Sequence, residues 1–134
     1  MGAFGPGSFE NDDALDFAAE LEASGAAALD DVLGRAAGAE GARDAGLGAA
    51  ALAAAEVVAA LAGRPSRELP DEVKLWVADA ELARPEVERL LGLARRAVTI
   101  VAGDSALARL WAAAKPAEHE GWRAALSDLQ RRLE

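Results

Sequence analysis

Residues 44–62 carry apolar or small side chains on nearly every side of a predicted helix. Asp44 is suited to cap the N-terminus of this helix. The leucines and valines that follow are distributed among alanines and glycines instead of along a single face. A helix without a polar face is stable only when other elements surround it. The sequence therefore predicts a central helix with further helices packed around it.

Glu56 is the one acidic residue of this stretch after the cap. Its neighbours on the helix, such as Leu52 and Ala60, are apolar. The carboxylate is therefore expected either on a narrow exposed edge or in the interior beside a cation, because an unpaired buried charge is costly. We favour the edge or a structural ion pair over a ligand-binding role. Arg95 and Arg96 are the candidate partners.

The rest of the chain is typical of amphipathic helices and contains no convincing strand. Helices are expected at about residues 11–23, 25–37, 70–77, 84–102, 105–114 and 118–133, with Ser24 capping the second and Asp104 or Ser105 the shorter fifth. The glycines of residues 34–48 indicate a loose connection. Leu15, Val32 and Leu110 are among the side chains expected to face inward, and Asp128 is expected to pair with Arg132 four residues on.

These expectations together predict an all-α fold, a compact bundle of six or seven helices in a single domain over residues 1–134. Residues 1–10 are expected to pack on it as an ordered segment rich in glycine and phenylalanine. Gly5 and Gly7 flank Pro6, which fixes its own φ, while glycine tolerates positive φ. Phe4 and Phe9 are the expected apolar anchors of this segment.

Composition excludes several classes of function. The formal net charge is −9, from 23 acidic and 14 basic residues, whereas a nucleic-acid surface needs a basic stripe. An acidic surface suits a basic protein or peptide partner, or a cation. Cysteine is absent, which excludes disulfides and thiolate chemistry and fits a cytoplasmic protein. No apolar run reaches the ~18 residues of a membrane span, so no membrane association is expected.

An acidic cluster follows the first ten residues and consists of Glu10, Asn11, Asp12, Asp13 and Asp16. In one interpretation, Asn11 caps a helix whose first-turn acids match the helix dipole. In the other, these carboxylates, joined by Glu56, would gather around a basic partner or a hard cation such as Mg²⁺, Mn²⁺ or Ca²⁺. The spacing does not match the calcium-binding EF-hand loop. Both interpretations remain open from the sequence.

The opening also resembles a bacterial family of uncharacterised proteins, the domain of unknown function 4259, whose members begin M-G-x-W-G-x-G-x-F-E-N-D-D-A-x-D-W. The matching residues here are Met1, Gly2, Gly5, Gly7, Phe9, Glu10, Asn11, Asp12, Asp13, Ala14 and Asp16. Phe4 and Phe17 replace tryptophans and lose the indole N–H donor. Later segments are similar too, so the resemblance covers nearly the whole chain. It implies a compact helical domain and implies no reaction.

No catalytic set is evident in the sequence. His119 is the single histidine and lies between Glu118 and Glu120, so it is expected to be a solvated residue at a helix start. Zinc sites usually take several His or Cys ligands, and none of the common nucleotide or hydrolase motifs is present. The sequence therefore favours a small non-enzymatic binding or regulatory module with an acidic N-terminal face and no cofactor. The alternative is a metal-assisted enzyme that uses the acidic cluster.

Overall fold

The polypeptide folds into α-helices alone over residues 5–134, which are the residues that the computed structural model describes. The eight helices of this range are α1 (Asp12–Ser24), α2 (Ala26–Ala36), α3 (Glu40–Arg43), α4 (Ala45–Leu61), α5 (Asp71–Asp79), α6 (Arg84–Ala102), α7 (Ala106–Ala112) and α8 (Pro116–Arg132). The predicted all-α fold is confirmed. One helix more than the six or seven expected is present, because the four-residue α3 was not foreseen. The predicted anchor Phe4 lies outside the described residues.

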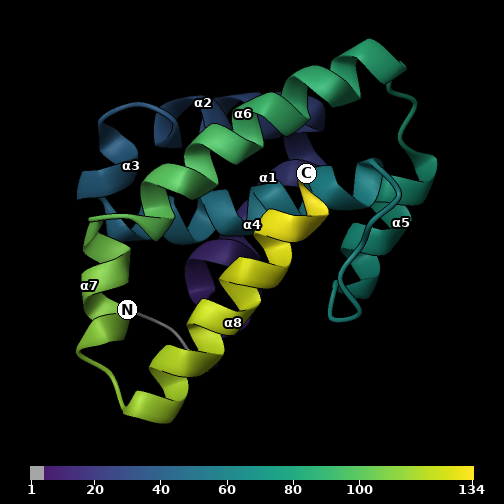
Figure 1. Ribbon diagram of the computed structural model, residues 1–134. Helices are drawn as coiled ribbons and strands as arrows, with labels where there is room; N and C mark the ends of the chain where they lie inside the picture. The colour runs from purple at the N-terminus through teal and green to yellow at the C-terminus, as the bar shows by residue number, and fades with distance from the viewer. Residues whose placement is uncertain (1–4) are drawn as a thin grey trace.

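Helix α4 occupies the centre of the molecule and packs against each of the other seven helices (Figure 1). Between Leu47 and Ala60, every residue except Ala50 is buried. Small side chains allow this close approach: a Cβ at Gly48 would lie 3.4 Å from the Cβ of Leu107 in α7. The predicted central helix is therefore confirmed. Within residues 5–134, no helix combines the length and apolarity that a membrane span requires.

Side-chain caps fix the beginnings of three helices. Asn11, Asp44 and Ser105 each accept a hydrogen bond from the backbone N–H three residues further on, at 2.8, 3.0 and 3.0 Å. These bonds satisfy N–H groups that have no partner within the helix. Asn11 and Asp44 therefore cap α1 and α4 as predicted, and Ser105 is the cap of α7.

The beginning of α2 differs from the prediction, because Ser24 does not cap it. The Ser24 hydroxyl donates instead to the Glu20 carboxylate at 2.8 Å, one turn back in α1. Gly25 separates the two helices at φ 65°, a conformation that favours glycine. The one residue between α1 and α2 is thus a glycine, which has no side chain to cap α2.

Residues 34–48 are also more regular than the loose connection that their glycines suggested. Helix α2 continues to Ala36, α3 follows after three residues, and Asp44 then caps α4. Gly41 of α3 is buried, and a Cβ there would lie 1.9 Å from the carbonyl oxygen of Ala36. The glycine therefore allows α3 to pack directly on the end of α2. Its role is to permit close packing, not to make the backbone flexible.

Two leucines that were predicted to face inward are exposed. Leu15 in α1 and Leu110 in α7 are 41% and 47% exposed. In α1 the buried stripe consists of Ala14, Phe17, Ala18 and Leu21. Phe17 is only 3% exposed and takes the core position that Leu15 was expected to fill. In α1 the predicted inward positions Ala18 and Leu21 are confirmed, and only Leu15 was placed wrongly.

Candidate functional site

A cleft of about 580 Å³ lies between the N-terminal segment, the loop that follows α4, and α8. We call it the acidic cleft. Its charged lining consists of four carboxylates and one guanidinium: Glu10, Glu56, Glu68, Asp128 and Arg132. The remaining lining residues are small, apolar or hydroxyl-bearing: Pro6, Gly7, Ser8, Phe9, Ser66, Pro70, Gly121, Ala124 and Ala125. Segments from both ends of the chain and from its middle therefore form one site.

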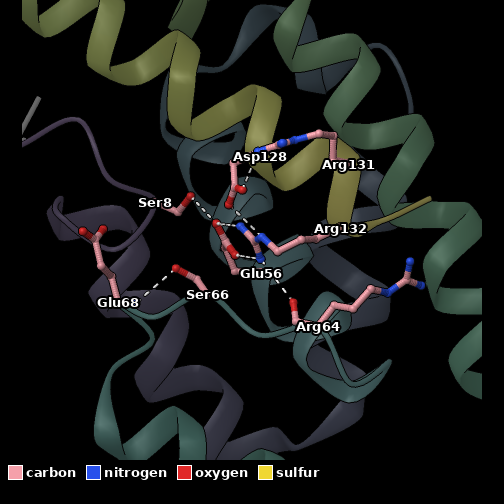
Figure 2. A network of polar contacts seen from close by, with 8 residues as sticks. All are labelled: Ser8, Glu56, Arg64, Ser66, Glu68, Asp128, Arg131 and Arg132. Carbon is pink, nitrogen blue, oxygen red and sulfur yellow. Dashed lines mark hydrogen bonds and ion pairs between the residues drawn. The ribbon is translucent and has the colours of Figure 1, made fainter.

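A bidentate ion pair between Glu56 and Arg132 forms the floor of the acidic cleft (Figure 2). The Arg132 Nη1 and Nη2 atoms donate to the two Glu56 carboxylate oxygens at 2.8 and 3.2 Å. The Glu56 side chain is 5% exposed and the Arg132 side chain is 16% exposed. Parallel guanidinium–carboxylate bonds are strong and directional, and they offset part of the cost of burying both charges. Glu56 is therefore buried and paired with a cation, which is one of the two arrangements expected from the sequence.

The partner of Glu56 was predicted wrongly as Arg95 or Arg96. The Nε atom of Arg95 donates instead to the backbone carbonyl of Leu133 at 2.6 Å, and Arg96 is exposed on α6. Arg132 reaches Glu56 because α8 packs against α4 near the end of the chain. The sequence contained no signal for a contact between residues 76 positions apart.

Asp128 extends the ion pair into a triad, and its predicted pairing with Arg132 is confirmed. The Arg132 Nε atom donates to Asp128 Oδ2 at 2.8 Å, and Arg131 Nη2 donates to Oδ1 at 2.8 Å. The hydrogen bond from Arg132, aided by the two positive charges, lowers the pKa of Asp128. Burial acts to lower the pKa of Arg132, but its bonds to Glu56 and Asp128 outweigh that effect and raise it. Asp128 and Arg132 are therefore both charged at neutral pH.

The same network holds the N-terminal segment and the loop after α4. The Ser8 hydroxyl donates to Glu56 Oε2 at 2.9 Å, and Arg132 Nη1 also donates to the carbonyl of Arg64 at 3.3 Å. Both oxygens of Glu56 are therefore occupied. The pair of Glu56 and Arg132 is thus bonded to both of these segments, as Figure 2 shows, and its role in the cleft is structural.

Two further carboxylates, Glu10 and Glu68, lie at the rim of the acidic cleft. Neither forms a salt bridge with any residue in the range 5–134. Glu10 Oε1 accepts the backbone N–H of Gly7 at 3.0 Å, which shapes the N-terminal segment. The side chain of Glu68 extends away from the triad (Figure 2). The rim therefore offers negative charge that no ion pair within residues 5–134 neutralises.

The other predicted site residues lie elsewhere. Asn11 caps α1, while Asp12, Asp13 and Asp16 do not line the acidic cleft. A Cβ at Gly46 would lie 3.0 Å from Asp13 Oδ1, which places this carboxylate at the N-terminal end of α4. In the described part of the chain, no three His, Asp or Glu side chains are placed to hold a metal ion.

The structure thus brings together only Glu10 and Glu56 of the six predicted site residues. Sequence reasoning missed the contributions of Ser8, Glu68 and the pair Asp128 and Arg132 to this site. The spacing of four residues on α8 identified the last two as an ion pair, but it carried no information about what they face. Glu68 lies in a loop, where no periodicity indicates its direction.

The comparisons with known proteins identify a family. No curated protein and no solved structure matched the chain. A family model with the description "Domain of unknown function (DUF4259)" matched residues 2–125. The match includes the N-terminal segment, α4 and the loop that follows it, and it ends before Asp128 and Arg132. Because the match covers most of the chain, the protein belongs to the DUF4259 family.

Proposed function

We propose that this protein is a cytoplasmic binding module whose acidic cleft receives a lysine or arginine side chain from a basic protein or peptide partner. The observation that carries the proposal is the lining of the cleft, which contains four carboxylates and a single guanidinium. That guanidinium belongs to Arg132 and is already committed to Glu56 and Asp128. A cationic group that enters the cleft would therefore meet uncompensated negative charge at the rim.

The walls of the acidic cleft suit the stem of a basic side chain as well as its head. Pro6, Phe9 and Pro70 contribute apolar surface, and the small residues Gly121 and Ala124 of α8 complete the lining. Lysine and arginine bury their methylene groups along apolar surface while their charged ends stay with polar partners. In this arrangement the stem would lie along the walls and the head between Glu10 and Glu68.

The floor of the acidic cleft supports the proposal through its rigidity. Glu56, Arg132 and Ser8 are joined by hydrogen bonds of 2.8 to 3.2 Å and hold three segments of the chain together. A site that is ordered before the ligand arrives loses less conformational entropy on binding. In this proposal the buried pair orders the cleft and takes no part in recognition.

Binding of labelled hexapeptides, measured by fluorescence anisotropy, tests the proposal. The probes carry a central lysine, arginine or uncharged norleucine in the same alanine and serine background. We expect the two basic peptides to bind and the norleucine peptide to bind at least about tenfold more weakly, because the charged contact is lost. Affinity should also fall as sodium chloride is raised, because the rim charges are exposed to screening.

Glu68→Gln is the variant that tests the acidic cleft itself, because it removes one rim charge at constant size. Glu81→Gln is the matched control: it removes the same charge from an exposed site outside the cleft. We expect Glu68→Gln to weaken the basic peptides severalfold and Glu81→Gln to leave them unchanged. Equal effects of the two variants, or equal binding of the norleucine peptide, would show that only the net charge of the chain attracts the probes.

A further inference from the structure

A second cleft, of about 450 Å³, lies on the other side of α8, between this helix, α7 and the end of α6. We call it the basic cleft and define it by the polar residues that line it: Arg109, His119, Arg123, Ser127 and Gln130. Figure 1 shows α7 leading directly into α8 at this corner of the molecule. The basic cleft shares no lining residue with the acidic cleft.

Helical geometry separates the two clefts. Gly121, Ala125, Asp128 and Arg132 of α8 line the acidic cleft, and His119, Arg123, Ser127 and Gln130 line the basic cleft. At 3.6 residues per turn, about 100° per residue, these two sets lie on opposite flanks of the buried stripe of α8. The stripe between them consists of Trp122, Leu126 and Leu129. The two clefts are therefore distinct surfaces of one rigid element.

All ionisable side chains that line the basic cleft are basic, although the chain has a net charge of −9. Arg123 takes part in no salt bridge within residues 5–134. Arg109 pairs with Asp104, whose side chain is 91% exposed. Guanidinium groups stay protonated at any physiological pH. An acidic protein repels anions over most of its surface. An anion would therefore bind preferentially at a cleft that contains two arginines.

The remaining groups of the basic cleft fit the recognition of an oxyanion attached to a compact apolar body. A guanidinium donates two parallel hydrogen bonds to a carboxylate or phosphate group. The Ser127 hydroxyl and the Gln130 amide are further donors in the lining. Ala108, Trp122 and Leu126 supply apolar surface, and the volume lies within the range of small-molecule sites.

We propose that the basic cleft is a second binding site, which takes a small organic anion through Arg109 and Arg123. The oxyanion lies between the two guanidinium groups, and the apolar body of the ligand packs against the side of α8 near Trp122. The Asp104 carboxylate uses one nitrogen of Arg109 and leaves the other donors of this guanidinium for the ligand.

The test uses the full-length, isotope-labelled protein and records amide and indole chemical shifts at constant ionic strength. Phenyl phosphate and benzoate are the probes, since they present a phosphate or a carboxylate on the same ring, and benzyl alcohol is the uncharged control. We expect saturable shifts at the Trp122 indole and at residues 108–112 and 119–130 with at least one of the two anions. The anion that binds more tightly identifies the preferred head group.

Arg123→Gln removes one guanidinium from the basic cleft, and we expect it to weaken binding by about tenfold or more. Arg96→Gln is the matched control, because it removes the same charge from an exposed position on α6 outside the cleft. Shifts that do not saturate with either anion, or an affinity that is equal in the two variants, would overturn the proposal. Neither variant alters the acidic cleft, so the outcome is independent of the function proposed above.

Discussion

Arg132 determines the energy of the buried ion pair, because it is the only cation bonded to the Glu56 carboxylate within residues 5–134 and donates two hydrogen bonds to it, whereas Ser8 adds one neutral hydrogen bond. Arg132→Met would leave that carboxylate buried without a cation. Loss of one partner of a buried pair typically costs about 3–5 kcal/mol. We expect a decrease in the free energy of unfolding near the lower end of this range, since Arg132 is 16% exposed, and urea denaturation would measure it.

Arg131→Gln provides the control for that measurement. Arg131 is the next residue and also bonds to Asp128, but its side chain is 73% exposed. Exposed ion pairs contribute about 0–1 kcal/mol, so this variant should stay close to the wild type. A similar loss of stability in the two variants would mean that the charge on Glu56 is solvated instead of buried.

The lowered pKa of Asp128 predicts part of the acid sensitivity of the fold. Because the hydrogen bond from Arg132 lowers the pKa of this carboxyl in the native state, the unfolded state binds the proton first as the pH falls. The resulting stabilisation is fully present above the unfolded pKa of about 3.9 and is lost as the pH falls through the lower native value.

Asp128→Asn should therefore reduce the dependence of the free energy of unfolding on pH in the acid range. Denaturation in urea at a series of pH values below about 5 would measure this dependence. Asp79→Asn, at an exposed position without a salt bridge in the described range, is the control. An unchanged acid dependence in Asp128→Asn would contradict the assigned role of the triad.

At the level of helices, two glycines that look alike in the sequence have opposite roles. A Cβ at Gly41 of α3 would lie 1.9 Å from a backbone oxygen of α2, whereas a Cβ at Gly34 of α2 meets nothing within 4 Å. We expect Gly41→Ala to destabilise the fold by about 1–3 kcal/mol through overpacking. Gly34→Ala should stabilise it by about 0.5–1 kcal/mol, because alanine is the better helix former.

Thermal unfolding of the two glycine variants would check this prediction. The substitution is the same in both, so a difference in melting temperature reports the surroundings of each glycine. If Gly41→Ala melted at or above the wild-type temperature, α3 would not be packed on the end of α2. If Gly34→Ala lowered the melting temperature, the space around this position would be smaller than the structure shows.

The sequence predicted these helices well where the evidence is local. Caps such as Asn11 and Asp44 act within three residues, and the helix ends expected at residues 62 and 102 agree closely with the observed ends of α4 at Leu61 and α6 at Ala102. The rotation of a helix depends on what covers it, which explains why Leu15 was placed inward while Phe17 occupies the core. Short helices such as α3 depend on tertiary packing, so periodicity does not reveal them.

The candidate site was much less predictable than the fold, because its residues are brought together by tertiary packing and not by local signals. Glu56 was recognisable as unusual because it interrupts an apolar helix, and its partner was not, because Arg132 comes from a distant helix. The acids at the start of α1 were predicted to form a site only because they lie close together in the sequence. Asp12, Asp13 and Asp16 do not line the acidic cleft, and their proposed roles in binding remain predictions.

At the level of the whole molecule, the contacts of α4 with every other helix predict highly cooperative unfolding. No helix can detach without exposing part of α4, so its backbone amides should exchange with solvent only when the entire fold opens. Hydrogen exchange measured against urea concentration would test this expectation. We expect the slowest amides within Leu52–Ala60 to report the same free energy as global unfolding. A lower value there would indicate that part of the structure opens independently of the rest.

The central position of α4 also has a practical consequence for engineering. The loop of residues 63–70 divides the chain into two pieces, and α4 lies at the end of the first. The first piece alone would expose the flank of α4 that α6 and α8 cover, and the second alone would lack the helix on which its own helices pack. Each half should therefore be unstructured in isolation and should gain order by reassociation with the other. The domain thus offers a natural split reporter for bringing two fused proteins together.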